Sequence, residues 1–212
     1  MSLEQKLNVG EWFGFPDLKA LGGFTGVVSQ GVVDLTVGDS AKQKLETKST
    51  RVRTSAAGSN LVKTHRNYTW LPWATGAVNY ADGQGQDVLS GAFSGCFMIR
   101  YKEAGGNWRV AHVSTGDGTD ARPAWNALAG QPGFQVSHGF KPYDLGRDQG
   151  LHAGMTGAFR FLGLITTAGD CWHFIVGPEP WDFATSAPKP LRKILYKKKL
   201  PSLSPASLLN LA

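Results

Sequence analysis

The sequence predicts an α+β protein with a β-sandwich-like core of mixed sheets and a few short flanking helices. Short apolar runs rich in β-branched and aromatic residues, which favour strands, alternate with glycine-containing turns. Glycine makes up 27 of the 212 residues, which favours turns over long helices. The length suits one domain, and 42% hydrophobic with 18% charged residues is typical of a globular chain.

The expected strands follow one another with short turns between them. They cover residues 67–73, 88–101, 108–115, 133–140, 157–166 and 171–177. Residues 24–37 favour a bulged strand or a hairpin, and residues 39–60 favour an exposed hairpin. The run 88–101 is apolar and small, which predicts one buried central strand. A Gly105-Gly106 turn would pair it with 108–115 as a hairpin, and a short helix is expected around 123–129.

Positive charge is concentrated near the end of the chain. The net charge is +6, from 22 basic and 16 acidic residues. Six basic residues and no acidic one follow Ser186: Lys189, Arg192, Lys193, Lys197, Lys198 and Lys199. The sequence therefore predicts a single domain over residues 1–186 and a basic C-terminal tail over 187–212. The tail is expected to be solvated, with phosphate-rich partners or anionic lipid as alternative ligands.

The cysteine count and the N-terminus bear on the cellular setting. Two cysteines, Cys96 and Cys171, are too few for a disulfide framework, although one disulfide is compatible with the sequence. No apolar run is long enough to span a membrane, and the N-terminus lacks the apolar core of a signal peptide. We expect a cytoplasmic protein or one that leaves its cell by a route that reads no Sec signal.

Cys96 and His112 form the strongest candidate site. Cys96 follows Ser94-Gly95, and a glycine there frees main-chain N–H groups, those of Gly95 and Cys96, to bind an oxyanion. His112 lies in the next predicted strand, and the midpoint of the pair adjoins the Gly105-Gly106 turn. A symmetric hairpin would place the two side chains opposite each other, with Cβ atoms about 4.5–5.5 Å apart. An imidazole at that spacing can activate a thiol, whereas the structural alternative is a buried cysteine and a core histidine.

Two motifs around this pair resemble a known family. Ser94-Gly95-Cys96, an apolar strand, a glycine turn and a histidine in Val-Ala-His-Val-Ser-Thr-Gly resemble the catalytic segment of the cytotoxic necrotizing factor deamidases. Trp70-Leu71-Pro72-Trp73 upstream, followed by Ser-Gly-Cys, is similar to Burkholderia lethal factor, a single-domain relative of similar length. The resemblance covers residues 67–116, and Phe93 stands where a leucine usually precedes Ser-Gly-Cys.

The resemblance implies a protein-glutamine deamidase, with 1–186 as the catalytic domain of a toxin or secreted effector. Cys96 would attack the amide of a target glutamine, and His112 would be the general base and acid, with glutamate and ammonia as products. In these relatives a hydroxyl or a main-chain carbonyl orients the histidine. Ser90, six residues before Cys96 and on the same strand face if the strand is regular, is the candidate, and a small strand residue is the alternative. The implied partner is a protein, such as a host GTPase or a translation factor.

Other functions stay open at this point. The same pair would serve a peptidase or a transglutaminase-like enzyme, and a β-sandwich that binds a ligand without catalysis would bury Cys96. Four residues are of metal-ligand types, but their spacing matches no strong zinc pattern: Cys171, His173, His138 and His152. We expect no metal, no cofactor, a monomer and no nucleic acid, since binding through the basic tail is the weakest alternative.

Overall fold

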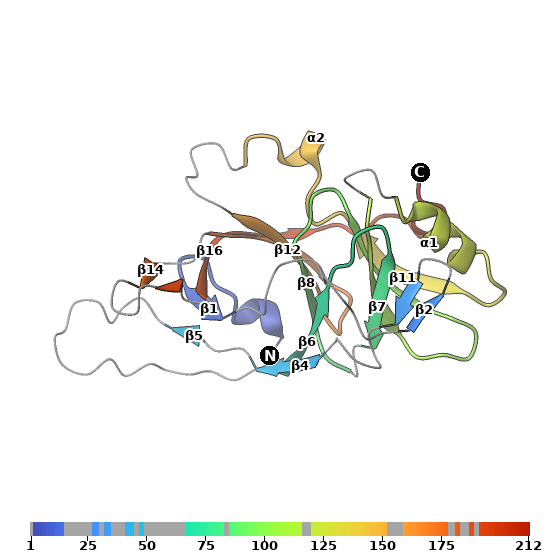
Figure 1. Cartoon of the computed structure of the whole chain (residues 1–212), viewed down its shortest axis with the longest axis horizontal. Coiled ribbons are helices and arrows are strands. Elements are labelled where there is room, and N and C mark those ends of the chain that lie inside the picture. The colour runs from blue at the N-terminus through green and yellow to red at the C-terminus, as the bar shows by residue number, and fades with distance from the viewer. Residues whose placement is uncertain are drawn as a thin grey trace.

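The computed structural model confirms the α+β class, with two large sheets and a few short helices (Figure 1). The residues that the structure describes are 2–14, 27–29, 32–34, 41–44, 47–48, 67–82, 85–115, 120–151, 159–177, 181–182, 187–188 and 191–212. The statements below concern these residues.

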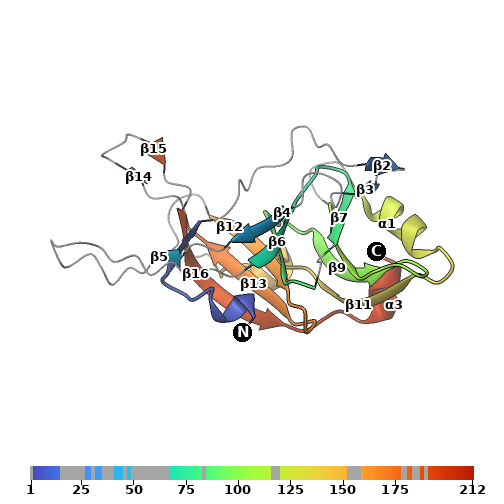
Figure 2. The same cartoon turned by 90° about the horizontal axis from the view of Figure 1, so that it is seen from below.

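Two sheets carry most of the described strands (Figure 2). The eight-stranded sheet has the spatial order β4 (Ala41–Lys44), β6 (Asn67–Pro72), β8 (Val88–Gly91), β12 (Arg160–Ile165), β13 (Cys171–Val176), β16 (Leu191–Leu200), β1 (Trp12–Gly14) and β5 (Thr47–Lys48). The six-stranded sheet has the order β11 (Gln135–Phe140), β9 (Phe97–Lys102), β10 (Arg109–Val113), β7 (Val78–Asp82), β3 (Val32–Asp34) and β2 (Val27–Ser29). The strands β14 (Trp181–Asp182) and β15 (Ala187–Pro188) pair separately. The β6–β8 and β3–β7 pairs are parallel, so both sheets are mixed.

Most of the expected strands are present. Within 24–37 the hairpin alternative holds, because β2 and β3 pair antiparallel. The expected hairpin over 39–60 is wrong in its described part, since β4 and β5 lie at opposite edges of the eight-stranded sheet. They pair with β6 and β1 instead of with each other. Residues 49–60 of that prediction lie outside the described residues.

Short helices flank the sheets. Within the described residues they are η1 (Leu3–Gln5), α1 (Arg122–Ala129), α2 (Leu145–Asp148) and α3 (Pro205–Leu209). α1 confirms the helix expected at 123–129 and buries Trp125. α3 begins after Ser204, whose hydroxyl accepts the N–H of Ser207 at 3.2 Å, a typical N-cap contact. None of the helices in the described part of the chain has the length and apolar character needed to cross a bilayer.

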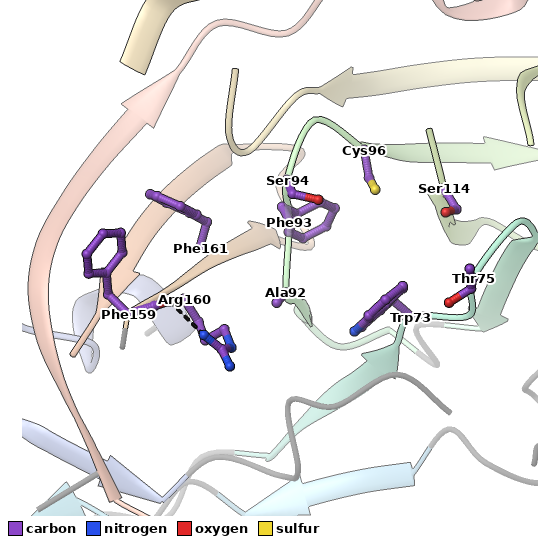
Figure 3. A pocket seen from close by; sticks show the side chains of 10 residues that line it. All are labelled: Trp73, Thr75, Ala92, Phe93, Ser94, Cys96, Ser114, Phe159, Arg160 and Phe161. Carbon is purple, nitrogen blue, oxygen red and sulfur yellow. Dashed lines mark hydrogen bonds between the residues drawn. The ribbon is translucent and has the colours of Figure 1, made fainter. Parts of the chain in front are cut away.

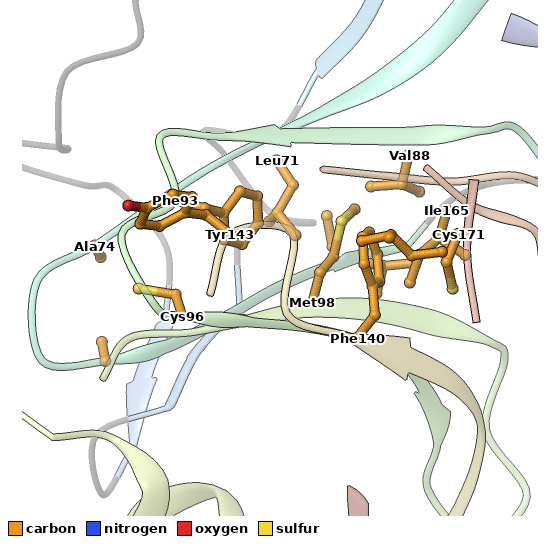
Figure 4. Packing of buried hydrophobic residues seen from close by; sticks show 14 residues of the cluster. Leu71, Ala74, Val88, Phe93, Cys96, Met98, Phe140, Tyr143, Ile165 and Cys171 are labelled. Carbon is orange, nitrogen blue, oxygen red and sulfur yellow. The ribbon is translucent and has the colours of Figure 1, made fainter. Parts of the chain in front are cut away.

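Each sheet is buried on both faces, which gives the sandwich its layers. The inter-sheet cluster contains residues from both sheets, among them Val88 of β8 and Met98 of β9 (Figure 4). The outer face of the eight-stranded sheet packs on Leu3 and Leu7 near the N-terminus. The outer face of the six-stranded sheet packs on α1 and α3 through residues such as Leu208. Side chains therefore alternate between two apolar layers along the central strands.

The run 88–101 forms two strands in different sheets, so the single central strand expected there is wrong. β8 ends at Gly91 in the eight-stranded sheet, and β9 begins at Phe97 in the six-stranded sheet. A Cβ on Gly91 would lie 2.3 Å from Leu162 Cδ2, so the crossing begins where the chain passes closest to β12. The N–H of Phe93 then donates to Phe161 O at 2.9 Å. Apolar composition alone does not reveal this crossing, because both strands are buried.

Residues 191–200 of the basic segment form a strand of the large sheet, which corrects the expected solvated tail for this part of it. Lys189 lies outside the described residues. β16 lies between β13 and β1, and Ile194 is fully buried. Lys197 Nζ donates to Glu4 O and lies 5.1 Å from the centre of the Trp172 ring. Lys199 pairs with Asp170 at 2.6 Å. The long lysine stems cover apolar surface while the charges reach solvent or partners, so a lysine-rich run is compatible with an internal strand.

The C-terminal helix supplies a direct test of this integration. We expect Leu208→Ala to lower the free energy of unfolding by about 2–5 kcal/mol, because the side chain is fully buried against Gly139. Leu209→Ala, at a side chain that is 38% exposed, should change it by less than about 0.5 kcal/mol. Urea unfolding of both variants measures the difference. Equal, small effects would mean that the segment is not part of the cooperative core.

Candidate active site

Cys96, His112 and Ser90 all face the layer between the two sheets. Cys96 belongs to the inter-sheet cluster together with Val110. His112 is two residues after Val110 on β10, so it has the same facing. Ser90 enters from β8 in the opposite sheet, two residues after Val88 of the same cluster. The structure thus places in one layer all three side chains that were singled out in the sequence, and Ser90 contacts His112 there.

The hairpin register differs from the expected one by two residues. β9 and β10 pair antiparallel as predicted, but the partner of His112 is Met98, not Cys96. Cys96 lies just before β9 and is therefore a diagonal neighbour of His112 on the same face. Diagonal Cβ atoms are about 7–8 Å apart or somewhat less, in place of the 4.5–5.5 Å expected for direct partners. The register is centred on Gly105, one residue later than a register that pairs Cys96 with His112. In the turn, the N–H of Gly106 donates to Glu103 O at 3.0 Å.

A chain of hydrogen bonds fixes the tautomer of His112. Ser90 Oγ lies 2.7 Å from Leu71 O and 2.9 Å from His112 Nδ1. A carbonyl oxygen only accepts, and a hydroxyl has one proton to donate. Ser90 therefore donates to Leu71 O and accepts from the Nδ1–H of His112. This assignment puts the ring proton on Nδ1 and leaves the lone pair on Nε2.

Ser90 thus contacts His112 from the opposite sheet. Ser90 and Cys96 were expected on one face of a single strand, which is wrong because the two residues belong to segments of different sheets. Ser90 and His112 are both fully buried, so water does not compete for their hydrogen bond. The contact is of the kind that an orienting group makes. The role itself stays a prediction.

The Nε2 atom of His112 is the basic atom that this network leaves free. It is buried and has no hydrogen-bond partner in the described part of the chain. Burial lowers the pKa of His112 to about 3, because an imidazolium in this apolar layer would lose its hydration. The ring is consequently neutral at neutral pH. A neutral imidazole with an unpartnered lone pair can take a proton from a neighbouring group.

Phe93 covers the imidazole of His112. The two rings are stacked, with centroids 4.1 Å apart and an interplanar angle of 7°. Gly163 of β12 makes room for this arrangement, since a Cβ there would lie 3.1 Å from Phe93 Cε2 and 2.5 Å from Pro142 Cγ. Phe93 also lines the pocket that contains Cys96. The phenyl ring therefore packs on the imidazole, fixes the plane of that ring and also forms part of the pocket wall.

The loop before Cys96 has a defined conformation. Gly95 has φ +119°, a value that side chains with a Cβ rarely adopt. Its carbonyl accepts the hydroxyl of Thr115 at 3.0 Å, which ties the loop to the end of β10. The neighbouring Ser114 is held by a bond from its N–H to Ala77 O at 3.2 Å. The oxyanion role expected for the N–H groups of Gly95 and Cys96 stays a prediction.

A pocket of about 250 Å³ opens over Cys96 (Figure 3). It is lined by Trp73, Thr75, Ala92, Phe93, Ser94, Cys96, Ser114, Phe159, Arg160 and Phe161. Cys96 is 4% exposed, and Figure 3 shows its sulfur pointing into the hollow between Ser94 and Ser114. The thiol is thus at the base of a small cavity with aromatic and hydroxyl walls.

The second cysteine is in a different environment. Cys171 lies at the far end of the inter-sheet cluster from Cys96 (Figure 4), and both cysteines are free. Burial raises the pKa of the Cys171 thiol to about 12, with a further contribution from Asp170. Burial therefore disfavours the thiolate of Cys171. Within the described residues, no three side chains of His, Cys, Asp or Glu gather as a metal site, and His152 lies outside those residues.

Several residues of the site carried no signal in the sequence. Phe93 was noted there only as a departure from the family's leucine, and Ser114 and Arg160 were not singled out. Trp73 lines the pocket, whereas Trp70 is a core residue at 4% exposure, so only the second tryptophan of the motif can meet a ligand. The residues that line the pocket come from loops and strand ends that meet only in the folded sandwich. The local spacing of residues in the sequence does not show which of these segments meet.

The Ser90 contact leads to a prediction for the reactivity of Cys96. Ser90→Ala removes the acceptor for Nδ1–H, so the tautomer with a basic Nε2 loses its stabilisation. We expect the His112-dependent alkylation rate of Cys96 to fall roughly two- to tenfold, the equivalent of one neutral hydrogen bond. Ser90→Thr keeps the hydroxyl and should retain most of the rate. If both variants react like the wild type, Ser90 has no orienting role.

The buried histidines predict a specific loss of stability in acid. Burial lowers the pKa of His112 to about 3 and that of His173 to about 4, below the ordinary value of 6.5. Between pH 6.5 and the lowered pKa values, each of these histidines takes up a proton when the protein unfolds. The free energy of unfolding therefore has its full value above pH 6.5 and falls as the pH drops below it. His112→Gln and His173→Gln should each reduce the slope by up to about 1.4 kcal/mol per pH unit. Urea unfolding between about pH 5 and pH 7 measures the slopes, and unchanged slopes in both variants would contradict this assignment.

Comparisons of the chain with protein-family models, with curated proteins and with solved structures find no match.

Proposed function

We propose that the protein is a glutamine deamidase that hydrolyses the side-chain amide of a glutamine in a protein substrate. The observation that carries the proposal is the free lone pair on His112 Nε2, which the Leu71–Ser90–His112 hydrogen bonds leave on the side-chain face shared with Cys96. The likeness of the Ser-Gly-Cys and Trp-Leu-Pro-Trp segments to the cytotoxic necrotizing factor deamidases supports the choice of substrate group.

The first half of the reaction forms a thioester. Nε2 of His112 takes the proton of the Cys96 thiol as the sulfur attacks the amide carbon of the glutamine. The negative charge on the amide oxygen is stabilised by the N–H groups of Gly95 and Cys96. When the tetrahedral intermediate collapses, the C–N bond breaks and the imidazolium gives its proton to the leaving nitrogen. Ammonia leaves, and the substrate is bound to Cys96 as a thioester.

The second half hydrolyses the thioester. Nε2 of His112, again neutral, takes a proton from a water molecule that attacks the thioester carbonyl. Collapse of this intermediate breaks the C–S bond, and the proton returns from His112 to the sulfur. The products are a glutamate side chain and the free Cys96 thiol. The net reaction consumes one water and releases one ammonia.

The low basicity of the buried imidazole decides the resting state of the pair. Because burial holds the pKa of His112 near 3, the imidazole of the resting pair is neutral. The charged pair forms only as the proton moves, when the thiolate and the imidazolium compensate each other in the apolar layer. The stacked Phe93 maintains this dry environment. His112 thus acts as a general base and does not hold a standing thiolate.

The size of the pocket supports attack on a side chain over cleavage of the main chain. Pockets for small ligands start at about 300 Å³, and the hollow over Cys96 is about 250 Å³. One glutamine side chain suits this volume better than an extended peptide. Product analysis separates the activities: a peptidase yields new chain ends, and a transglutaminase-like enzyme joins the substrate to an amine.

The cellular setting is part of the proposal. As in the family that the motifs resemble, the substrate would be a host or rival-cell protein, such as a small GTPase or a translation factor. The chain would act as a toxin or secreted effector that reaches its target without a Sec signal. It would act as a monomer without a cofactor.

The test is site-specific alkylation by iodoacetamide, followed for Cys96 and Cys171 separately by peptide mass spectrometry. Cys96 should react at least about tenfold faster than Cys171 below the ordinary thiol pKa of about 8.5, because only Cys96 has a neighbouring base. His112→Ala should remove this advantage, and Cys171 is the control within each sample. Cell lysates would then be screened for a protein in which a glutamine is converted to glutamate, with release of ammonia and with Cys96→Ser as the inactive control. Slow alkylation of Cys96, or an unchanged rate in His112→Ala, would contradict a catalytic pair and favour the ligand-binding β-sandwich.

A further inference from the structure

Among the described residues that line the pocket over Cys96, Arg160 alone carries a formal charge. The other described lining residues are aromatic, small or hydroxylic, and none of them is a carboxylate. Low-dielectric walls around a single charge concentrate its field in the cavity. We therefore expect the pocket to attract anions and repel cations.

The guanidinium of Arg160 has donors to spare. Its recorded polar contact is one hydrogen bond from Nη1 to Phe159 O, at 3.0 Å. No carboxylate of the described residues pairs with it, and the side chain is exposed at the start of β12. A guanidinium has five N–H groups arranged to bind a carboxylate with two parallel bonds. Most of these groups are available to a ligand.

A second donor faces the same end of the pocket. Trp73 Nε1 is buried and has no hydrogen-bond partner within the described residues. Figure 3 shows the indole across the hollow from Cys96, with its nitrogen at the end nearer Arg160. An indole N–H only donates, and a buried donor without a partner is costly. An acceptor bound next to Arg160 would satisfy it.

We propose that Arg160 and Trp73 form a subsite for a carboxylate, so that the target glutamine lies next to an aspartate or glutamate in the substrate. This inference rests on the proposed deamidase function. With the glutamine amide at Cys96, the acidic side chain would extend along the aromatic wall toward Arg160 and receive its hydrogen bonds. Glutamines flanked by lysine or arginine would be poor substrates because their charge meets Arg160.

The test uses small probes that label Cys96. N-iodoacetyl-glutamate amide and N-iodoacetyl-glutamine amide have the same shape and differ in one charge. In the wild type the glutamate probe should label Cys96 about tenfold faster at low salt, the equivalent of one charge-assisted hydrogen bond. Arg160→Gln should make the two rates equal. Arg160→Glu should reverse the preference, with N-iodoacetyl-lysine amide becoming the fastest probe.

Controls separate this inference from the proposed function. Arg122→Gln removes a positive charge from α1, outside the pocket lining, and should leave the ratio of the glutamate and glutamine rates unchanged. Trp73→Phe keeps the aromatic wall without the N–H and should reduce the ratio in part. If Cys96 reacts rapidly but the ratio is the same in wild type and Arg160→Gln, the subsite is overturned and the catalytic pair stands. If Cys96 reacts with no probe, the proposed function fails, and the subsite fails with it.

Discussion

The hydrogen bond from His112 Nδ1 to Ser90 Oγ joins the two sheets, and the state of the imidazole depends on it. One partner belongs to the six-stranded sheet and the other to the eight-stranded sheet. The bond forms only when the sheets pack in one relative position. It also decides which ring nitrogen keeps a lone pair. The lone pair on Nε2 is therefore a property of the whole sandwich and not of the hairpin that carries His112.

The crossing between the sheets makes this geometry possible. The segment after Gly91 leaves β8 and delivers Cys96 to the start of β9, so the thiol and Ser90 reach the same layer from opposite sides. Along the way Phe93 is placed over the imidazole. The same few residues thus supply the thiol, cover the imidazole and form one wall of the pocket. A crossing one residue longer or shorter would turn Cys96 to the helix-covered face of the sheet.

Local patterns in the sequence were sufficient for the fold class and for most strands, because β-branched runs and glycine turns are signals within a few residues. Cys96, His112 and Ser90 could be named for the same reason, from short motifs and spacing. The run 88–101 was misassigned because an apolar sequence has the same composition whether it forms one buried strand or two. The basic segment was misread as a tail because lysine stems can cover an internal strand, as Lys197 does over Trp172. The role of Phe93 and the neutral state of His112 could not be predicted, because both arise from contacts between segments far apart in the chain.

The position of β16 has a consequence for biosynthesis. β1 pairs with β16, so its partner leaves the ribosome long after β1 itself. β13 pairs with β16 as well, and β12 with β13, so the strand that carries Arg160 belongs to the same set of pairings. Pairings as distant in sequence as β1 with β16 are slow to form. The eight-stranded sheet therefore stays incomplete until residues near Lys193 have been synthesised, and the strands made before them wait for a partner during elongation.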